Sequence, residues 1–297
     1  MKLFCIGSIN IDHIYLVPRY QLAGETLADT GYRTGLGGKG CNQSLAAAAA
    51  GATVKMVGAV GDDGGWAIDH LADAGIDVGR VSLVPEATGH AVINVTPEGE
   101  NQIVIHGGAN RAVSEGMIKD TLRDAIAEQW WLCQEETSLV PWSAKMAKDA
   151  GLKIAYSAAP FVPEAALEML PLSDVVAVNS GEAAALAAAC GTDIESIPVP
   201  MLVVTKGADG VDILERGRLT RIDAFEVDPI DTTGAGDTFF GTFLAGLDKG
   251  HSPIQAGHRA AAAAALQVTR PGAAEAIPSS TDVDAFLAER TDRCARF

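Results

Sequence analysis

The sequence has few basic residues, and this scarcity excludes whole classes of partner. Only 22 Lys and Arg stand against 38 Asp and Glu, which gives a net charge of -16. A chain this acidic lacks the basic face that nucleic acids and anionic membranes require. We therefore expect no nucleic-acid partner and no membrane partner. Any phosphate that the protein binds must be held by a local site, because the negative net charge of the chain repels it.

Closely spaced cysteines and long apolar runs are also missing. The five cysteines are scattered and form no CxxC pair: Cys5, Cys41, Cys133, Cys190 and Cys294. This pattern argues against a disulfide framework or a zinc site and suits a reducing compartment. The first residues, MKLFCIGSINID, lack the basic start and apolar core of a signal peptide. No segment approaches the roughly 18 apolar residues that a bilayer span needs. A soluble, cytoplasmic protein is expected.

Apolar stretches of strand length alternate with helical stretches along the chain. The predicted strands are 2–9, 53–61, 130–134, 152–158, 175–179 and 201–207, and the predicted helices are 41–52, 66–76, 114–129, 141–151 and 181–191. This alternation predicts an α/β fold with a mostly parallel central sheet and helices on both faces. The length suits one large domain spanning 1–297.

Two segments break the alternation. Residues 90–108 read as two alternating strands around a Pro-Glu-Gly-Glu-Asn turn, which predicts a β-hairpin. Residues 11–35 hold short strand-like pieces with no helix between them. We expect a small β-sheet lid, formed by about 11–35 and 88–109, over the crevice where open α/β sheets bind ligands.

The run GLGGKG (35–40) matches the letters of the G-x-G-x-x-G dinucleotide fingerprint, but not its expected position in the chain. That fingerprint should follow the first strand directly, and here polar residues intervene. The phosphate loop G-x-x-x-x-G-K-[ST] is absent. A tight turn that caps a helix is the simpler interpretation of GGKG.

The run DTTGAGDTFFGTFLAGL (231–247) combines glycines and aspartates with an apolar helix predicted over 238–247, after a strand predicted over 221–227. Gly234, Ala235 and Gly236 leave backbone N–H groups open at the helix start, where the dipole also favours an anion. Asp237 beside them suits a general base that takes a proton from a hydroxyl attacking a phosphoryl group. The alternative is structural: a helix N-terminal charge, with glycines for the turn.

Two motifs together resemble a known family. GGKGCNQSLAAAAAGA (37–52) and DTTGAGDTFFG (231–241) are similar to the two signatures of the PfkB carbohydrate kinases, the ribokinase-like family, with the ribokinases as the nearest subgroup. The resemblance runs almost end to end and includes GSINIDH near the start, NSGE at 179–182, TKGADG at 205–210 and VTRPGA at 268–273.

The resemblance implies a role for each matching position. The sugar-binding residues would be Asn10, Asp12, Gly38, Lys39, Asn42 and Glu136, with Asp237 as catalytic base. Gly234, Ala235 and Gly236 would form the anion hole, and the nucleotide-binding residues would be Asn179, Thr205, Gly207, Gly234 and Gly236. Glu182 would organise magnesium through water, and the residues implied for a potassium loop are Asp231, Thr233, Arg270 and Gly272. Each also has a plain structural interpretation, such as an exposed loop carboxylate for Asp12, a strand-end charge for Glu136 or a turn residue for Asn179.

The sequence departs from the family pattern in three places. Ser157 stands where ribokinases usually carry an Asn, the segment between NSGE and TKG is short, and Ala276 replaces a frequent Ser near the cation loop. The last change removes one possible oxygen ligand. His13, His90, His106 and Cys41 are interpreted as structural or substrate-lining.

The resemblance implies an ATP-dependent sugar kinase that uses ATP, Mg²⁺ and K⁺, with ribose converted to ribose 5-phosphate as the favoured reaction. The competing hypotheses are a kinase for another sugar, a keto-deoxy sugar acid or a nucleoside, and a catalytically silent sugar- or nucleotide-binding regulator. Its partners would be the sugar and ATP, with a homodimer through the lid sheet as a further expectation.

Overall fold

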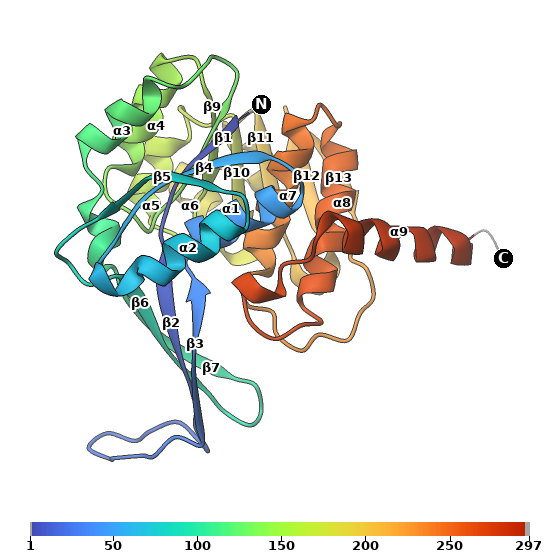
Figure 1. The fold of residues 1–297 in the computed structure, drawn as a ribbon. Helices are drawn as coiled ribbons and strands as arrows, with labels where there is room; N and C mark the ends of the chain where they lie inside the picture. The colour runs from blue at the N-terminus through green and yellow to red at the C-terminus, as the bar shows by residue number, and fades with distance from the viewer. Residues whose placement is uncertain (1, 295–297) are drawn as a thin grey trace.

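The computed structural model describes residues 2–294, with side chains to residue 290, and arranges them as a larger sheet covered by helices and a smaller sheet that projects from it (Figure 1). The larger sheet has nine strands in the described chain. In sheet order these are β13 (Arg218–Ile222), β12 (Val211–Glu215), β11 (Met201–Thr205), β10 (Val175–Asn179), β9 (Lys153–Ser157), β8 (Trp130–Gln134), β1 (Lys2–Ile6), β4 (Thr53–Val60) and β5 (Asp77–Leu83). All neighbours from β11 to β5 are parallel, and β12 and β13 add an antiparallel edge. The predicted α/β class is confirmed.

Helices cover both faces of this sheet because successive strand residues point to opposite sides. In β1, Leu3 and Cys5 belong to one buried cluster and Phe4 and Ile6 to the other. The first face carries α1 (Lys39–Ala49), α2 (Gly65–Asp73), α7 (Ala235–Asp248) and α8 (Pro253–Gln267). The second face carries α3 (Glu115–Leu122), α4 (Val140–Asp149), α5 (Pro163–Met169) and α6 (Ser180–Cys190). The last helix, α9 (Ser280–Cys294), packs against α8.

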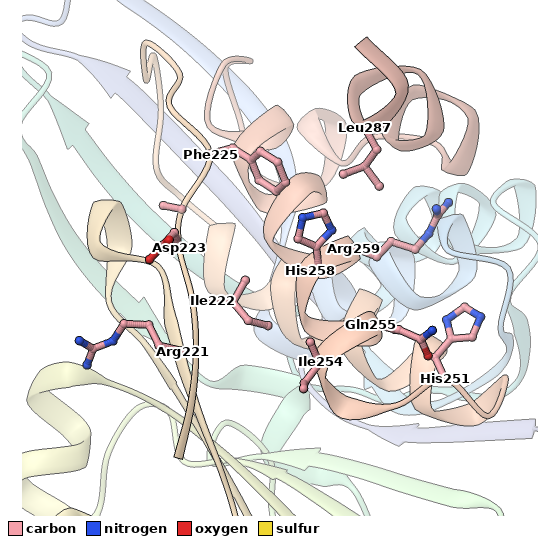
Figure 2. Close-up of a pocket in the computed structure, with 11 residues that line it drawn as sticks. Arg221, Ile222, Asp223, Phe225, His251, Ile254, Gln255, His258, Arg259 and Leu287 are labelled. Carbon is pink, nitrogen blue, oxygen red and sulfur yellow. The ribbon is translucent and has the colours of Figure 1, made fainter. Parts of the chain in front are cut away.

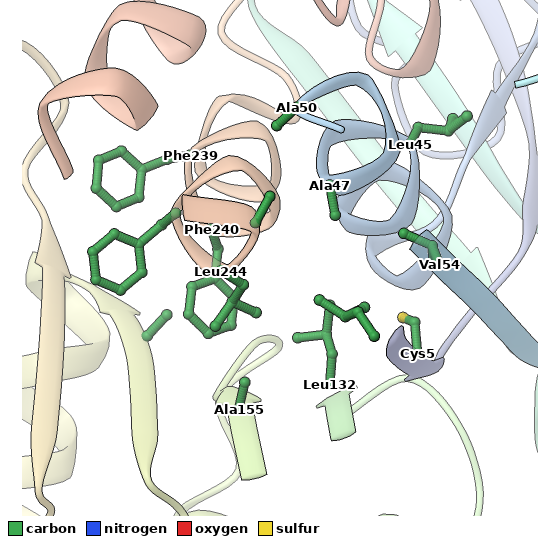
Figure 3. Close-up of a cluster of buried hydrophobic side chains, with 14 of the residues drawn as sticks. Cys5, Leu45, Ala47, Ala50, Val54, Leu132, Ala155, Phe239, Phe240 and Leu244 are labelled. Carbon is green, nitrogen blue, oxygen red and sulfur yellow. The ribbon is translucent and has the colours of Figure 1, made fainter. Parts of the chain in front are cut away.

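Helices α1 and α7 lie side by side on the sheet, and this contact positions the site. Figure 3 shows their apolar side chains gathered above Leu132 and Ala155 of the sheet. Phe239 and Phe243, one helical turn apart in α7, stack with ring centroids 5.9 Å apart. A Cβ built at Gly241 would lie 2.3 Å from the Gln43 carbonyl oxygen, so glycine at this position lets the two helices approach.

The smaller sheet has the order β3 (Gly31–Gly37), β2 (Asn10–Leu16), β6 (Gly89–Val95) and β7 (Asn101–His106). Strand β2 pairs antiparallel with β3 and parallel with β6, and β6 pairs antiparallel with β7 as the predicted hairpin requires. In Figure 1 this sheet projects from the strand ends of the larger one. The chain passes from β1 into β2 within a few residues, so β2 begins beside the parallel sheet.

Two predicted elements extend well past their observed ends. The helix predicted over 114–129 ends at Leu122, and turns lead from it to β8. The strand predicted over 221–227 ends at Ile222, which pairs with Val211 at the first residue of β12, so no partner strand exists beyond it. None of the helices in the described residues has the length and hydropathy of a membrane-crossing segment.

Candidate active site

A cavity of about 260 Å³ lies where the carboxyl ends of β9, β10 and β11 meet the start of α7. This cavity is lined by eight of the residues to which the family resemblance assigns a role: Lys39, Asn179, Glu182, Thr205, Gly234, Ala235, Gly236 and Asp237. Parallel sheets place their carboxyl strand ends along one edge, where open α/β folds bind ligands. The topology therefore brings together segments that are far apart in the sequence.

The loop over residues 231–236, called the anion loop below, forms one wall of this cavity. Gly234 is the N-cap of α7 and has a left-handed backbone (φ 75°). A Cβ built at Gly236 would meet no atom within 4 Å, so this residue faces open space in a cavity wall. The first N–H groups of a helix have no partner inside the helix, and its dipole is positive at that end. A helix start of this kind is suited to an anion.

Asp237 follows these donors in the chain. Its carboxylate is buried and accepts hydrogen bonds from two side chains of α1. Asn42 Nδ2 donates to Oδ2 of Asp237 over 3.2 Å, and Gln43 Nε2 donates to Oδ1 over 2.8 Å. Gln134 Nε2 in turn donates to Gln43 Oε1 over 2.6 Å. The charge of Asp237 is the largest influence that raises the pKa of Lys39. Both oxygens of Asp237 therefore accept amide hydrogen bonds, which favour a carboxylate in one fixed orientation.

Asn42 also leaves a buried polar atom without a partner. Its Oδ1 has no hydrogen bond within the described chain, although the residue is only 6% exposed. Buried acceptors are normally paired, so this oxygen is suited to a hydroxyl donor from a ligand that lies beside Asp237.

The other residues predicted to bind the sugar lie around the base of the small sheet. Glu136 Oε2 accepts the backbone N–H of Lys39 over 3.0 Å and also accepts from the Ser8 hydroxyl. Asn10 is buried, and its Oδ1 accepts from Asn110 Nδ2 over 2.7 Å. Gly38 is the N-cap of α1 with φ 92°, where a Cβ would lie 2.8 Å from the Ser8 carbonyl oxygen. These contacts hold the start of α1 against the first strand.

Asp12 lies in an unfavourable electrostatic environment. Burial is the main cause that raises its pKa to about 7, and the charges of Glu275 and Glu136 add to the shift. A Cβ at Gly37 would fall 2.2 Å from Asp12 Oδ2, so a glycine on β3 makes room for this carboxylate. A ligand that donates hydrogen bonds to Asp12 would relieve this repulsion.

Asn179 and Glu182 form a capping box at the start of α6. Asn179 Oδ1 accepts from the Glu182 N–H over 2.9 Å, and Glu182 Oε2 accepts from the Asn179 N–H over 2.8 Å. Thr205 is paired with Asn179 in the sheet register, whereas Gly207 (φ 58°) opens the next turn and does not line the cavity. Within the described chain no three His, Cys, Asp or Glu side chains form a metal cage. Mg²⁺ usually binds through one or two carboxylates, waters and substrate phosphates, and Glu182, which lines the cavity, fits that mode.

The residues predicted for a potassium loop are Asp231 and Thr233 of the anion loop and Arg270 and Gly272 of the segment after α8. Asp231 accepts two backbone N–H groups, from Thr233 over 2.9 Å and from Gly272 over 3.0 Å. The Arg270 guanidinium pairs instead with Asp282 over 3.2 Å, so only its backbone is available to the loop. Ala276 is buried and offers no side-chain oxygen.

A glutamine side chain already occupies this site. Gln267 Nε2 donates to the Thr233 carbonyl over 2.9 Å and to the Ala273 carbonyl over 3.3 Å. These residues therefore do not fit a potassium ion well.

Several of these positioning residues were missed by the sequence analysis: Gln43, Asn110, Gln134, Gln267 and Glu275. Only Gln43 carried a signal, because it adjoins Asn42 in the first family motif. Glu275 accepts the Leu36 N–H over 3.2 Å and so links the segment after α8 to the small sheet. Ser157, one of the departures from the family pattern, lines the cavity at the end of β9.

A larger hollow of about 750 Å³ lies elsewhere, between β13 and α8 (Figure 2). Phe225 and His258 meet edge to face in its wall, with ring centroids 5.2 Å apart. It contains none of the residues predicted to bind sugar, phosphate or metal. Its size alone does not make it the catalytic site.

The chain is similar to known proteins over nearly its whole length. A family model described as pfkB family carbohydrate kinase matches residues 1–280. Ribokinase of Haemophilus influenzae is 36% identical, with 95% of this chain and 97% of that protein aligned. A deoxyribokinase of Salmonella typhimurium is 30% identical, with 97% of this chain and 99% of that protein aligned. The structure of Arabidopsis thaliana ribokinase complexed with ribose and ATP is similar with a TM-score of 0.82 and 28% identity, covering 96% of this chain and 97% of that one.

Proposed function

The chain belongs to the pfkB family of carbohydrate kinases, and we propose that it transfers the γ-phosphate of ATP to ribose, giving ribose 5-phosphate. The observation that carries the proposal is the placement of Asp237. Its carboxylate is buried, is held by two amide donors and adjoins the N-terminus of α7 in a cavity wall. An anion site and a base side by side are the two parts that phosphoryl transfer to a hydroxyl requires.

The proposed reaction uses these groups in one step. The sugar hydroxyl loses its proton to Asp237 as its oxygen forms a bond to the γ-phosphorus, and the bond between that phosphorus and the β,γ-bridging oxygen breaks to release ADP. The N–H groups at Gly234 and Gly236 would stabilise negative charge on the transferred group. The Ala235 N–H would join them by leaving the Thr232 carbonyl, to which it donates over 3.3 Å in the ligand-free chain. Lys39, whose pKa is raised mainly by Asp237, stays protonated and adds positive charge in the cavity wall.

ATP and Mg²⁺ are the proposed nucleotide and metal. Mg²⁺ bound to the phosphates would neutralise charge on the ATP tail. Glu182 would hold its waters, since the capping box with Asn179 fixes the carboxylate at the cavity. Thr205 ends β11 in the same wall and is placed to contact the phosphates, with Gly207 following it in the chain.

The sugar is proposed to lie between Asp237 and the base of the small sheet. The unpaired Asn42 Oδ1 supports this location, and so does the carboxylate of Asp12, whose burial the charge of Arg33 compensates only in part. Glu136, Asn10 and the α1 start around Gly38 complete the polar wall. A pocket with several acceptors selects a polyhydroxylated ligand. The small sheet would act as a lid that excludes water, so that residues 1–297 work as one kinase domain.

The substrate is tested by measuring ADP release with ribose, 2-deoxyribose, fructose, a keto-deoxy sugar acid and inosine. We expect the highest kcat/KM for ribose. A higher value for 2-deoxyribose would instead favour the activity named for the Salmonella relative, and a higher value for fructose, the sugar acid or inosine would identify a kinase for that acceptor. Asp237→Asn should lower kcat by about 10² to 10⁴ while ATP still binds. No turnover with any acceptor, despite ATP and sugar binding, would identify a silent binding protein.

A homodimer through the small sheet is proposed as the assembly. Strand β7 is an edge strand, and three successive apolar residues on it are exposed: Ile103 (45%), Val104 (66%) and Ile105 (55%). Successive residues face opposite sides, so both faces of this edge carry apolar surface that a second copy could cover. Analytical ultracentrifugation should show a dimer that Val104→Glu dissociates. Leu219→Glu, at an exposed site of the edge strand β13, is the matched control that should not dissociate it.

A cytoplasmic location is also proposed. Cys5, Cys41, Cys133 and Cys190 are free thiols, and the first three are buried. Unpaired thiols suit a reducing compartment, and fractionation of the producing cells tests the assignment.

A further inference from the structure

The side chain of Gln267 holds the anion loop from below. Gln267 is the last residue of α8, and it is completely buried together with Thr238 in the first turn of α7. Its Nε2 donates to the Thr233 carbonyl over 2.9 Å and to the Ala273 carbonyl over 3.3 Å, while its Oε1 accepts from the Thr238 hydroxyl. One amide therefore joins the anion loop, the segment after α8 and the helix that carries Asp237.

The orientation of this amide follows from its partners. Two carbonyl oxygens can be satisfied only by a donor, so the NH₂ end must face them and the oxygen must face the hydroxyl. A Cβ built at Gly234 would lie 2.9 Å from Gln267 Nε2, which places the amide directly against the N-cap of α7. The positive end of a side-chain dipole thus lies under the anion-binding turn.

A bound monovalent cation would make different use of the same groups. Potassium in proteins is held by several oxygens, typically backbone carbonyls. Here the Thr233 carbonyl accepts from Gln267, and the Ala273 carbonyl accepts from both Gln267 and the Ala276 N–H (3.3 Å). Asp231 already accepts two backbone N–H groups, and Ala276 has no side-chain oxygen. The loop is satisfied by hydrogen bonds from the chain itself.

We propose that Gln267 is a positioning residue whose side-chain amide orders the anion loop in place of a monovalent cation, so that catalysis does not require potassium. The inference rests on the kinase activity proposed above, because the ordered loop matters only if it receives a phosphoryl group. Gln267 acts through the backbone of Thr233 and through Thr238, not on the substrate.

The first test needs no substitution. Sugar-dependent ADP release by the wild-type enzyme is measured in potassium chloride and in tetramethylammonium chloride at equal ionic strength, after exhaustive desalting. Equal kcat in the two salts is the expected result. A clear activation by potassium would overturn the proposal.

The second test asks whether the amide does the ordering. Gln267→Ala removes the donor to the Thr233 carbonyl, whereas the Ala273 carbonyl keeps the Ala276 N–H. We expect kcat in tetramethylammonium to fall by about tenfold or more, with partial recovery in potassium. Gln267→Glu keeps the size but sets an oxygen against the two carbonyls, so it should acquire the same potassium requirement. Ser252→Ala removes the N-cap of the same helix at its far end and should lower only the melting temperature, with no potassium response.

A readout without turnover separates this proposal from the proposed function. Hydrogen–deuterium exchange of a peptide covering 229–238 is followed in the nucleotide-free protein. Wild type should show the same protection in both salts, whereas Gln267→Ala should lose protection and regain part of it in potassium. Unchanged loop protection in Gln267→Ala would overturn the role of the amide, even if the kinase activity stands. If no sugar is phosphorylated, the exchange result still decides what orders the loop.

Discussion

Gln43 donates a hydrogen bond of 2.8 Å from Nε2 to Oδ1 of Asp237, although the two residues are 194 positions apart. The bond spans the contact between α1 and α7, and Gln134 at the end of β8 continues it with a 2.6 Å bond to Gln43 Oε1. The orientation of the proposed base therefore depends on a buried amide relay that begins in the central sheet.

Gln43→Ala tests this relay. The substitution removes one donor to the carboxylate and leaves the Gln134 amide without its acceptor. We expect kcat to fall by about tenfold and the KM for ATP to change little. Steady-state rates at varied ATP and sugar concentrations measure both effects.

A matched control lies beside β8, the strand that carries Gln134. Gln129 is also a buried glutamine just before the first residue of β8, and its Oε1 accepts the Ile126 N–H over 2.8 Å. Gln129→Ala should lower stability and leave kcat unchanged. If both variants behave alike, Gln43 contributes only to folding.

Gly234→Ala and Gly236→Ala should separate folding from catalysis within one turn. Alanine at Gly234 must adopt a left-handed backbone, at a cost of about 1–2 kcal/mol, and its Cβ would lie 2.9 Å from Gln267 Nε2. We expect a lower melting temperature for this variant. Alanine at Gly236 meets no protein atom but fills space in the cavity wall, so it should keep its melting temperature and lose turnover. Thermal melts measure the stability of both variants, and ADP release measures their turnover. A lower melting temperature with unimpaired turnover for Gly236→Ala would contradict the assignment of an anion hole.

Asp12→Asn should stabilise the ligand-free protein in a pH-dependent way. Burial and two neighbouring carboxylates raise the pKa of Asp12 to about 7 in the folded state, against about 4 in the unfolded chain. Between these values the folded state binds the extra proton, so the contribution of Asp12 to the free energy of unfolding falls as pH rises and levels off above about pH 7. The melting temperature of Asp12→Asn relative to wild type should therefore increase from acidic pH to pH 7 and then stay constant. Asp69→Asn, on the exposed side of α2, should show no such trend.

Asp12→Ala tests the sugar contact itself. Hydrogen bonds to a charged group contribute about 1.5–3 kcal/mol each, so kcat/KM for ribose should fall by about 10- to 1000-fold with the KM for ATP nearly unchanged. The wild-type KM for ribose should also rise below pH 7, since a protonated Asp12 accepts fewer hydrogen bonds. A change in the KM for ATP instead of the kcat/KM for ribose would contradict this location of the sugar in the cavity.

The sequence by itself determined the class of fold and the chemistry of the candidate site. Alternating apolar strands and helices predicted the parallel sheet, and the hairpin around 90–108 predicted part of the smaller one. The glycines and Asp237 of one short run predicted an anion site beside a base, because those groups are neighbours in the chain. Strands β5 and β12 and helices α5 and α9 were not predicted from the sequence, and β12 proved decisive for where β13 ends.

Only the tertiary structure decided what holds those groups in place. Gln43, Gln134 and Gln267 look like ordinary polar residues in the sequence, and their partners lie on other elements. A glutamine amide can donate or accept, so its role is set by what the fold places against it. The same holds for Asp12. Its pKa depends on burial and on the charge of Glu275, which is distant in the sequence and comes close to Asp12 only in the folded chain. Local sequence specifies reactive groups, whereas hydrogen-bond partners and desolvation arise only when distant segments pack together.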